Sequence, residues 1–546
     1  MGIYVNQIGY PISGKKVAIS TAPCNFQIIN ASTQSSVFDG VTGTGIMDKS
    51  AGEEVYQIDF SEVTTPGSYY ILAGNKEKSC TFSIQANTYK SLKTDLLKCL
   101  YYQRCGCELK EEHAGIYTHK TCHTEPAIFL EDYMNKTPNP QSFDMTGGWH
   151  DAGDFGRYIS PAGVTIGHLL YAYELFPESL QDDLNIPETG NGIPDILNEC
   201  AYELKWMLKM QREDGGVYHK LTSFVHADFV MPEDDKLQFL IFPVSSMATA
   251  DFAASMALAS RVYASVMPEF AAEMKDAAMK AWKWLTENPY VGFKNPEGSN
   301  TGEYDDTDDT DERLWAVAEM LRMDPENKDN YIPYLKEYTA ASISKTDFGW
   351  TDVSGLGTLA LIFDPACTCG QELIDEYKTV IFNEADRLLD IMKSSGYHLA
   401  MEAEDFVWGS NMVVCNRGML FILAALLSQG EKAESYKEAA FNQLHYLLGC
   451  NALDVSYVTG HGEKAYKNPH NRPTAMDGIE LPMPGWVSGG PFKTPVDPDA
   501  IRIIPAGSAP MKCYADHTGS YSTNEITIYW NSPAVFMTAY FETLEK

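Results

Sequence analysis

The spacing of apolar residues changes near residue 88, and this change most constrains the fold. From there on they recur at intervals of three and four, as Leu92, Leu96 and Leu97 do in the first segment, which is the period of an amphipathic helix. An even number of such segments along one chain predicts a mainly α fold, a closed double ring of helices (an α/α toroid). The twelve predicted helices span residues 89–104, 161–176, 194–212, 247–264, 269–286, 311–323, 329–343, 352–363, 371–394, 411–429, 433–449 and 532–544.

Residues 1–85 have a different pattern. Short apolar stretches such as FQIIN and GSYYILA are separated by Gly, Pro, Asn and Ser, which predicts strands joined by tight turns. Their spacing favours a small immunoglobulin-like β-sandwich, although the sequence lacks the Cys…Trp…Cys pattern of antibody domains. We therefore expect two domains, a β-sandwich over residues 1–85 and a helical domain over residues 88–546.

The charge balance restricts the partners. The 546 residues include 74 Asp and Glu against 41 Lys and Arg, a formal net charge of −33. This excess repels nucleic acids and anionic membranes, so we expect neither as a partner, and a neutral substrate fits it better. No apolar run approaches the roughly 18 residues that a membrane-spanning helix needs. The sequence leaves the oligomeric state open.

The N-terminus and the cysteines bear on the compartment. The first residues, MGIYVNQIGYP, enter strand-like sequence at once, without the basic and apolar regions of a signal peptide. Either the protein is cytosolic or a leader has been removed; we expect an extracellular protein whose leader is absent from this chain, with the cytoplasm as the alternative. The 12 cysteines are too few for a disulfide scaffold, so buried thiols or metal ligands are expected.

Two aspartates lie close together in the first of several long, Gly-rich connections between predicted helices. The motif GGWHDAGDFGRY places Asp151 and Asp154 three residues apart. One interpretation is structural: Asp151 caps a helix or pairs with Arg157. The other is a carboxylate pair in which one group orients a water that the other deprotonates. An inverting glycosidase also needs a carboxylic acid about 6.5–9.5 Å from its base, and this acid must come from elsewhere in the chain.

Glu525 is the candidate for that acid. It lies in STNEITIYWNSP, beside Ile526, Ile528 and Trp530. Apolar and aromatic surroundings favour the protonated form of a carboxyl group, as a general acid requires. An exposed glutamate at the edge of a helix or strand is the alternative.

Two further clusters contain residue types that bind metals. Cys105, Cys122, His123 and His150 form a full tetrahedral set for structural zinc, although free thiols are the alternative because the spacing is not that of a compact zinc finger. The stretch TGEYDDTDDTDERLW, residues 301–315, offers closely spaced oxygen ligands that suit calcium. Capping of the helix that follows is a competing use of the same side chains.

Eight motifs in order make the chain resemble a known family. GGWHDAGDFGRY, GVYHKLTSF, VMPEDD, SSMATADFAASMALASRVY, DERLWAVAEM, FVWGSN, NPHNRP and STNEITIYWNSP closely resemble glycoside hydrolase family 9, in the subgroup with an N-terminal immunoglobulin-like domain. The resemblance covers nearly the whole chain. It implies an (α/α)6 barrel, in agreement with the twelve predicted helices, and cleavage of β-1,4-glucans with inversion.

The resemblance also assigns roles by position. Asp154 matches the general base, Asp151 the aspartate that helps to hold the attacking water, and Glu525 the general acid. The substrate-binding His-His-Arg of the family is His470-Asn471-Arg472 here, so its first and last residues are kept. Where the family has Tyr five residues after the acid, this chain has Trp530, next to Tyr529.

For the metals, the resemblance implies structural zinc on Cys105, Cys122, His123 and His150. It implies calcium near the acidic stretch, for which we expect Thr301, Glu303, Asp306 and Asp308 as ligands, with Glu233, Asp234 and Asp235 as a second possible group. Among the loop aromatics, Trp350 and Trp408 each lie beside a predicted turn and are the expected platforms for sugar rings.

Together these features predict an endo-β-1,4-glucanase that acts on β-1,4-glucans or cello-oligosaccharides. One alternative is an exo-acting β-glucosidase or glucosaminidase that works on short oligosaccharides. The other is a non-catalytic carbohydrate-binding protein with the same fold, against which the presence of all three acids argues.

Overall fold

The computed structural model describes residues 1–74, 76–342 and 344–545. The chain divides into two compact units, and one of them is assembled from distant parts of the sequence. The first unit comprises Met1–Cys99, Phe382–Ala475 and Ile479–Lys546, and the second comprises Leu100–Ile381 and Met476–Gly478. No helix of the described residues is long and apolar enough to cross a membrane.

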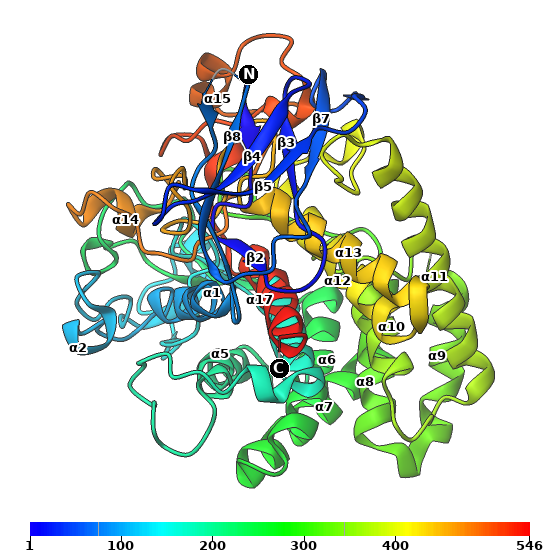
Figure 1. Cartoon of the computed structure of the whole chain (residues 1–546). Helices are drawn as coiled ribbons and strands as arrows, with labels where there is room; N and C mark the ends of the chain where they lie inside the picture. The colour runs from blue at the N-terminus through cyan, green and yellow to red at the C-terminus, as the bar shows by residue number, and fades with distance from the viewer. Residues whose placement is uncertain (75, 343, 546) are drawn as a thin grey trace. The chain divides into compact units, whose positions relative to one another are not determined.

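The first unit contains the predicted β-sandwich (Figure 1). One sheet has the strand order β1-β3-β7-β6 and the other the order β2-β10-β8-β4-β5, with β9 paired to β8. The strands are β1 (Ile3–Tyr4), β2 (Gly9–Pro11), β3 (Val17–Ser20), β4 (Asn25–Asn30), β5 (Ser36–Val41), β6 (Ile46–Asp48), β7 (Glu53–Asp59), β8 (Gly67–Ala73), β9 (Glu77–Lys78) and β10 (Phe82–Gln85). The inner faces bury Phe26, Ile28 and Ile71, which removes their apolar surface from water and holds the two sheets together.

The first unit also contains helices α12 (Ser410–Leu426), α13 (Gly430–Leu447) and α17 (Ile528–Thr543), which pack against one another. The sandwich is joined to α13 and its C-terminal end by hydrogen bonds. The Gln7 N–H donates to the Leu448 carbonyl over 2.9 Å, and Asn6 Nδ2 lies 3.0 Å from His445 Nδ1. The shorter helices α14 (Arg472–Met476), α15 (Pro498–Ile503) and α16 (Tyr521–Asn524) lie in the long segment between α13 and α17.

The second unit is mainly helical. Helix α4 packs against α5 and α6, α6 against α7 and α8, and α8 against α9 and α10. The helices of this unit are α2 (Glu111–Ala114), α3 (Leu130–Asn135), α4 (Ile159–Leu175), α5 (Asp195–Lys209), α6 (Ser246–Tyr263), α7 (Pro268–Glu287), α8 (Thr310–Met323), α9 (Ile332–Ala341) and α10 (Ser354–Ile362). Helices α1 (Lys90–Tyr102) and α11 (Gln371–Ser394) each contain a point where the chain passes from one unit to the other, and the chain crosses again at both ends of Met476–Gly478.

The long connections of the second unit form a small sheet that the sequence did not predict. Its order is β12-β11-β15-β14-β13, and its strands are β11 (Ala127–Phe129), β12 (Ser142–Phe143), β13 (Arg157–Tyr158), β14 (Lys220–Thr222) and β15 (Leu240–Ile241). Strands β13 and β14 are antiparallel and pair Tyr158 with Lys220. This sheet gives the connections around the candidate site a fixed backbone.

All twelve predicted helices are present, each displaced by a few residues at most. The prediction of a mainly helical protein preceded by an immunoglobulin-like β-sandwich is therefore confirmed. Residues 343 and 546, where one predicted helix and the predicted second domain end, lie outside the described residues. The domain boundary between residues 85 and 88 stays a prediction.

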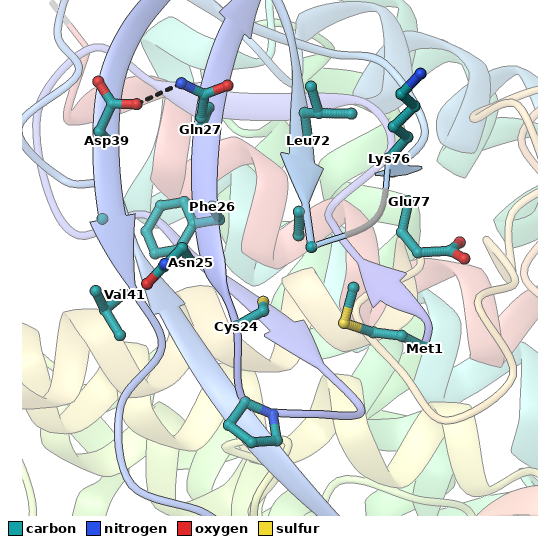
Figure 2. Close-up of a pocket in the computed structure, with 14 residues that line it drawn as sticks. Met1, Cys24, Asn25, Phe26, Gln27, Asp39, Val41, Leu72, Lys76 and Glu77 are labelled. Carbon is teal, nitrogen blue, oxygen red and sulfur yellow. Dashed lines mark hydrogen bonds between the residues drawn. The ribbon is translucent and has the colours of Figure 1, made fainter.

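A cavity of about 1000 Å³ lies on the sandwich, lined by residues that include Met1, Phe26 and Val41 (Figure 2). Gln27 Nε2 donates to Asp39 Oδ1 over 2.6 Å at its edge. The residues lining it include none of those predicted for catalysis or for binding of sugar or metal, so this cavity is separate from the candidate site.

Candidate active site

The aspartate-bearing motif is a tightly folded, buried loop ahead of β13 and α4. The Asp151 N–H donates to the Gly156 carbonyl over 2.9 Å, which closes the loop on itself. Gly148 has a φ of +77°, and a Cβ there would lie 2.7 Å from the Trp206 ring. Only glycine fits this backbone conformation and this close approach.

Residues 103–105 hold the loop from one side. Gln103 Nε2 donates to the Ala152 carbonyl over 2.8 Å, and the His150 N–H donates to the Gln103 carbonyl over 2.7 Å. Arg157 Nη1 donates to the Met145 and Gly147 carbonyls over 2.8 and 2.6 Å. The guanidinium group therefore bonds to the backbone of the loop. The structural interpretation of the motif had instead paired Arg157 with Asp151.

Each aspartate accepts a hydrogen bond from a tyrosine. Asp151 is 2% exposed, and the Tyr304 hydroxyl donates to its Oδ2 over 2.5 Å. Asp154 is 7% exposed, and the Tyr158 hydroxyl donates to its Oδ2 over 3.2 Å. Burial, together with the nearby Asp154 and Asp151 carboxylates, raises the pKa of Tyr158 well above its usual value, so this hydroxyl keeps its proton and acts as a donor.

Two further side chains lie beside these carboxylates. His226 Nδ1 is 3.3 Å from Asp154 Oδ2, and the Trp350 ring meets the Tyr304 ring edge-on at a centroid distance of 5.0 Å. Trp350 was predicted as a sugar platform, and its half-buried ring joins the aspartate cluster through Tyr304. The contact of His226 was missed because no local pattern relates residue 226 to residue 154.

Glu525 belongs to the first unit, where it lies beside the predicted substrate-binding histidine. It is half-buried and follows α16 directly. An isolated β-bridge pairs His470 with Glu525, and the His470 N–H donates to the Asn524 carbonyl over 2.9 Å. The Glu525 carbonyl accepts from the Gly489 N–H over 2.9 Å, so the backbone around the predicted acid is fixed on both sides.

The other predicted sugar-binding residues of the first unit differ in exposure. Trp408 is 41% exposed, and its ring lies 5.5 Å from that of Tyr521, which in turn is 5.9 Å from His470. Arg472 is buried at the start of α14. Tyr529 and Trp530 are 6% and 3% exposed. Trp408 therefore offers an open ring face, whereas Tyr529 and Trp530 mainly fill the interior.

The four predicted zinc ligands lie together. Among the described residues, the ligand atoms of Cys105, Cys122, His123 and His150 are the only group of three or more His, Cys, Asp or Glu atoms gathered as if to hold a metal, all within 4.8 Å of one another. Cys105 Sγ is 3.6 Å from His123 Nδ1, and His150 Nε2 is 3.3 Å from the same atom. All 12 cysteines are free of disulfides.

These separations fit a tetrahedral zinc site. Zinc bonds of about 2.0–2.1 Å to nitrogen and about 2.3 Å to sulfur place tetrahedral ligands about 3.3 Å (N–N) and about 3.6 Å (S–N) apart. Burial raises the pKa of the Cys105 thiol, but a hydrogen bond from Cys122 and the charges of Arg157 and the two histidines outweigh it, so the pKa lies well below the usual value. His123 Nε2 lies 3.3 Å from Asp235 Oδ2, a contact that orients the imidazole as the outer partners of metal ligands do.

The predicted calcium ligands do not form a comparable group. Thr301 Oγ1 accepts from the Lys220 ammonium over 3.0 Å, and Glu303 Oε2 accepts from the Asn295 N–H over 2.8 Å. Asp306 and Asp308 accept backbone N–H bonds in the turn ahead of α8. These contacts match a use of the acidic stretch in turns, whereas Asp309, the N-cap residue of α8, makes no side-chain cap hydrogen bond.

Comparison with models of known protein families shows to which family of enzymes this chain belongs. The model for glycosyl hydrolase family 9 matches residues 89–538, and that for the cellulase N-terminal ig-like domain matches residues 1–78. The first match covers most of the chain. The protein therefore belongs to glycoside hydrolase family 9 and is a glycoside hydrolase with an N-terminal immunoglobulin-like domain.

Two relatives are similar over nearly the whole chain. A cellodextrinase of Butyrivibrio fibrisolvens is 42% identical over 98% of both chains. Endoglucanase D of Acetivibrio thermocellus is 34% identical over 99% of this chain and 83% of its own length.

Two solved structures of endoglucanases are similar to this chain over nearly its whole length. A single mutant of the thermostable endoglucanase from Alicyclobacillus acidocaldarius superposes with a TM-score of 0.91 at 34% identity, covering 99% of both chains. A Zn-binding triple mutant of the family 9 endoglucanase J30 has a TM-score of 0.89 at 30% identity, covering 97% of this chain and 99% of its own.

Proposed function

We propose that this enzyme hydrolyses β-1,4-glucosidic bonds by a single displacement with inversion. The observation that carries the proposal is the buried pair Asp151 and Asp154, each held by a tyrosine hydroxyl, in a chain of family 9. Two carboxylates fixed in this way suit the binding and deprotonation of one water molecule.

In this mechanism Asp154 is the general base and Asp151 orients the attacking water. Glu525 is the general acid that protonates the leaving oxygen. The base removes a proton from water as the oxygen attacks the anomeric carbon, and the bond to the leaving sugar breaks on the opposite face. His470 and Arg472 would bind hydroxyl groups of the sugar at the cleavage point, and Trp350, Trp408, Tyr529 and Trp530 remain the proposed aromatic contacts.

We propose a structural role for metal in the second unit. Zinc on Cys105, Cys122, His123 and His150 would fix the residue before Asp151, and so the backbone that presents both aspartates. When bound, the ion supplies coordination only, and every proton transfer falls to the carboxylates. Calcium on Thr301, Glu303, Asp306 and Asp308 stays a prediction, to which the turn contacts of these residues are the alternative.

The preferred substrate is a β-1,4-glucan cleaved internally. A second candidate is release of single sugars from short cello-oligosaccharides, because a relative that is 42% identical is named cellodextrinase. A polymeric substrate would be met outside the cell, which favours the extracellular location, whereas short oligosaccharides are compatible with the cytoplasm.

Cellohexaose separates these candidates. Mixed oligomers in the early products support internal cleavage, single glucose units support the exo-acting alternative, and no products would indicate a carbohydrate-binding protein. Proton NMR of the first products tests the stereochemistry, since inversion releases the α-anomer. A β-anomer as first product would contradict the single displacement.

Substitution of the acids tests their roles. We expect Asp154→Asn and Glu525→Gln to lower kcat on cellohexaose by about 100-fold or more, because each removes one proton-transfer group. Thermal midpoints should stay near that of the wild type. Ordinary activity in either variant would disprove the role assigned to that residue. Asp144→Asn, an exposed aspartate close in sequence, is the matched control and should leave kcat unchanged.

A further inference from the structure

A fully buried lysine stands beside the candidate site without a carboxylate among its hydrogen-bond partners. Lys220 begins β14 and is 0% exposed. Burial of an ammonium group costs free energy unless its donors are satisfied. Burial lowers the pKa of Lys220 to about 7, against the opposing effects of the Asp154 and Glu303 carboxylates.

Neutral oxygens surround this ammonium group, and the Thr301 carbonyl, at 3.4 Å from Nζ, is the most distant of the four. Nζ donates over 2.7 Å to Asn295 Oδ1, over 3.0 Å to Thr301 Oγ1 and over 2.7 Å to the Gly302 carbonyl. The centroid of the Phe242 ring lies 4.4 Å from Nζ, in the range of a cation–π contact. The ammonium therefore holds residues 295–302 against β14, much as a bound cation would.

The segment fixed by Lys220 carries the contacts to both aspartates. The Gly302 N–H donates to the Tyr158 hydroxyl over 3.1 Å, and that hydroxyl donates to Asp154. Two residues further along, the Tyr304 hydroxyl donates to Asp151. Tyr158 also lies opposite Lys220 in the β13–β14 register.

The backbone at Tyr304 needs such support. Its φ is +45°, in the left-handed region that residues other than glycine seldom adopt and that persists only when surrounding contacts enforce it. The Lys220 contacts immediately precede this position, and Asp151 and Trp350 contact the tyrosine side chain.

We propose that Lys220 is a positioning residue, whose ammonium fixes residues 295–304 so that Tyr158 and Tyr304 hold Asp154 and Asp151 in the geometry for activating water. This inference rests on the proposed roles of the two aspartates. Lys220 contacts neither water nor sugar in this role and acts only through the tyrosines.

Kinetics of Lys220→Met test the proposal, because methionine keeps the apolar stem and removes the ammonium. On cellohexaose we expect kcat to fall about 10- to 100-fold, as misplaced catalytic groups do, and KM to change by less than about twofold, since sugar contacts are untouched. Lys275→Met, at an exposed lysine of α7, is the matched control and should behave as wild type.

A double-mutant cycle separates positioning from general loss of structure. If Lys220 acts through Tyr304, then Lys220→Met combined with Tyr304→Phe lowers kcat little more than Lys220→Met alone. Multiplying effects, or a kcat of Lys220→Met equal to that of wild type, would overturn the proposal. If Lys220→Met does not fold, Asn295→Ala removes one acceptor only and takes its place in the same cycle, with the same two outcomes.

Asp154→Asn in the same assay separates failure of the positioning role from failure of the proposed mechanism. An inactive Asp154→Asn beside a fully active Lys220→Met would overturn the positioning role and leave the proposed mechanism intact. An active Asp154→Asn would remove the proposed mechanism itself.

Discussion

At Asp151 the hydroxyl group of a distant tyrosine helps to hold the carboxylate in place. Tyr304 donates to Oδ2 from a residue 153 positions along the chain, while the Asp151 N–H closes the loop with Gly156. The carboxylate is thus held from its side chain and from its backbone. A carboxylate held in this way does not have to be reorganised when water binds, so that free-energy cost is avoided, which is the advantage of a preorganised site.

Loss of that hydroxyl should slow the reaction without unfolding the protein. We expect Tyr304→Phe to lower kcat on cellohexaose about 10-fold or more, since a hydrogen bond to a charged group contributes about 1.5–3 kcal/mol. Tyr133→Phe, which removes the hydroxyl of an exposed tyrosine in the same unit, serves as control. Equal kcat values for the two variants would show that the hydrogen bond from Tyr304 to Asp151 does not contribute to catalysis.

At the scale of single elements, long regular segments were predictable and short ones were not. Helices such as α11 and α7 repeat their apolar period over several turns, so the sequence alone locates them. Strands β13 and β14 have two and three residues, too few for any period to appear. Their pairing depends on residues that are distant in the sequence, as Tyr158 and Lys220 are.

The residues of the candidate site also fall into those that the sequence could predict and those that it could not. Asp151, Asp154 and the four Cys and His ligands lie in recognisable motifs, and each could be named from the sequence. The contributions of Lys220 and His226 could not be named from the sequence, because no local pattern records contacts over such separations. The hydrogen-bond partners of Lys220 are 75 to 82 residues away, and the partner of His226 is 72 residues away. Tyr304 lies in the acidic stretch of residues 301–315, where no local pattern relates it to Asp151.

The Cys/His cluster leads to a prediction about this loop as an element. The purified protein should contain about one zinc per chain, and Cys122→Ser should lower both the zinc content and the thermal midpoint, because metal binding contributes to folding free energy. Metal analysis and thermal unfolding measure the two effects. Cys107→Ser is the matched control, since Cys107 lies outside the cluster. Equal zinc content in the two variants would contradict the ligand assignment.

On the scale of the whole molecule, the two units differ in how they are assembled. The second is almost one continuous stretch, whereas the first joins the sandwich to helices from the other end of the chain. In the first unit, the Phe441 and Phe541 rings stack at a centroid distance of 3.9 Å, and Tyr89 lies 6.2 Å from Phe541. These rings tie the residue that follows the sandwich to α13 and α17.

The division into units predicts which regions loosen together. Phe541→Ala removes a fully buried ring and should cost about 3–5 kcal/mol. Hydrogen exchange should then accelerate in the sandwich strands as well as in α13 and α17, and stay unchanged in α6 and α7. Phe270→Ala, at a buried ring of α7 in the second unit, should give the reverse pattern. Acceleration confined to α17 in the first variant would contradict a cooperative first unit.

The split origin of the first unit has a consequence for biosynthesis. A ribosome releases the sandwich strands first and α17 last, and domains generally fold as their residues emerge. The partners of Gln7 and Asn6 are Leu448 and His445, so these two hydrogen bonds of the sandwich form only after α13 has been translated. The stretch Leu100–Ile381 has most of its partners already within it. The hydrogen bonds that join the sandwich to α13 therefore form late in synthesis, after the residues of this middle stretch have already emerged.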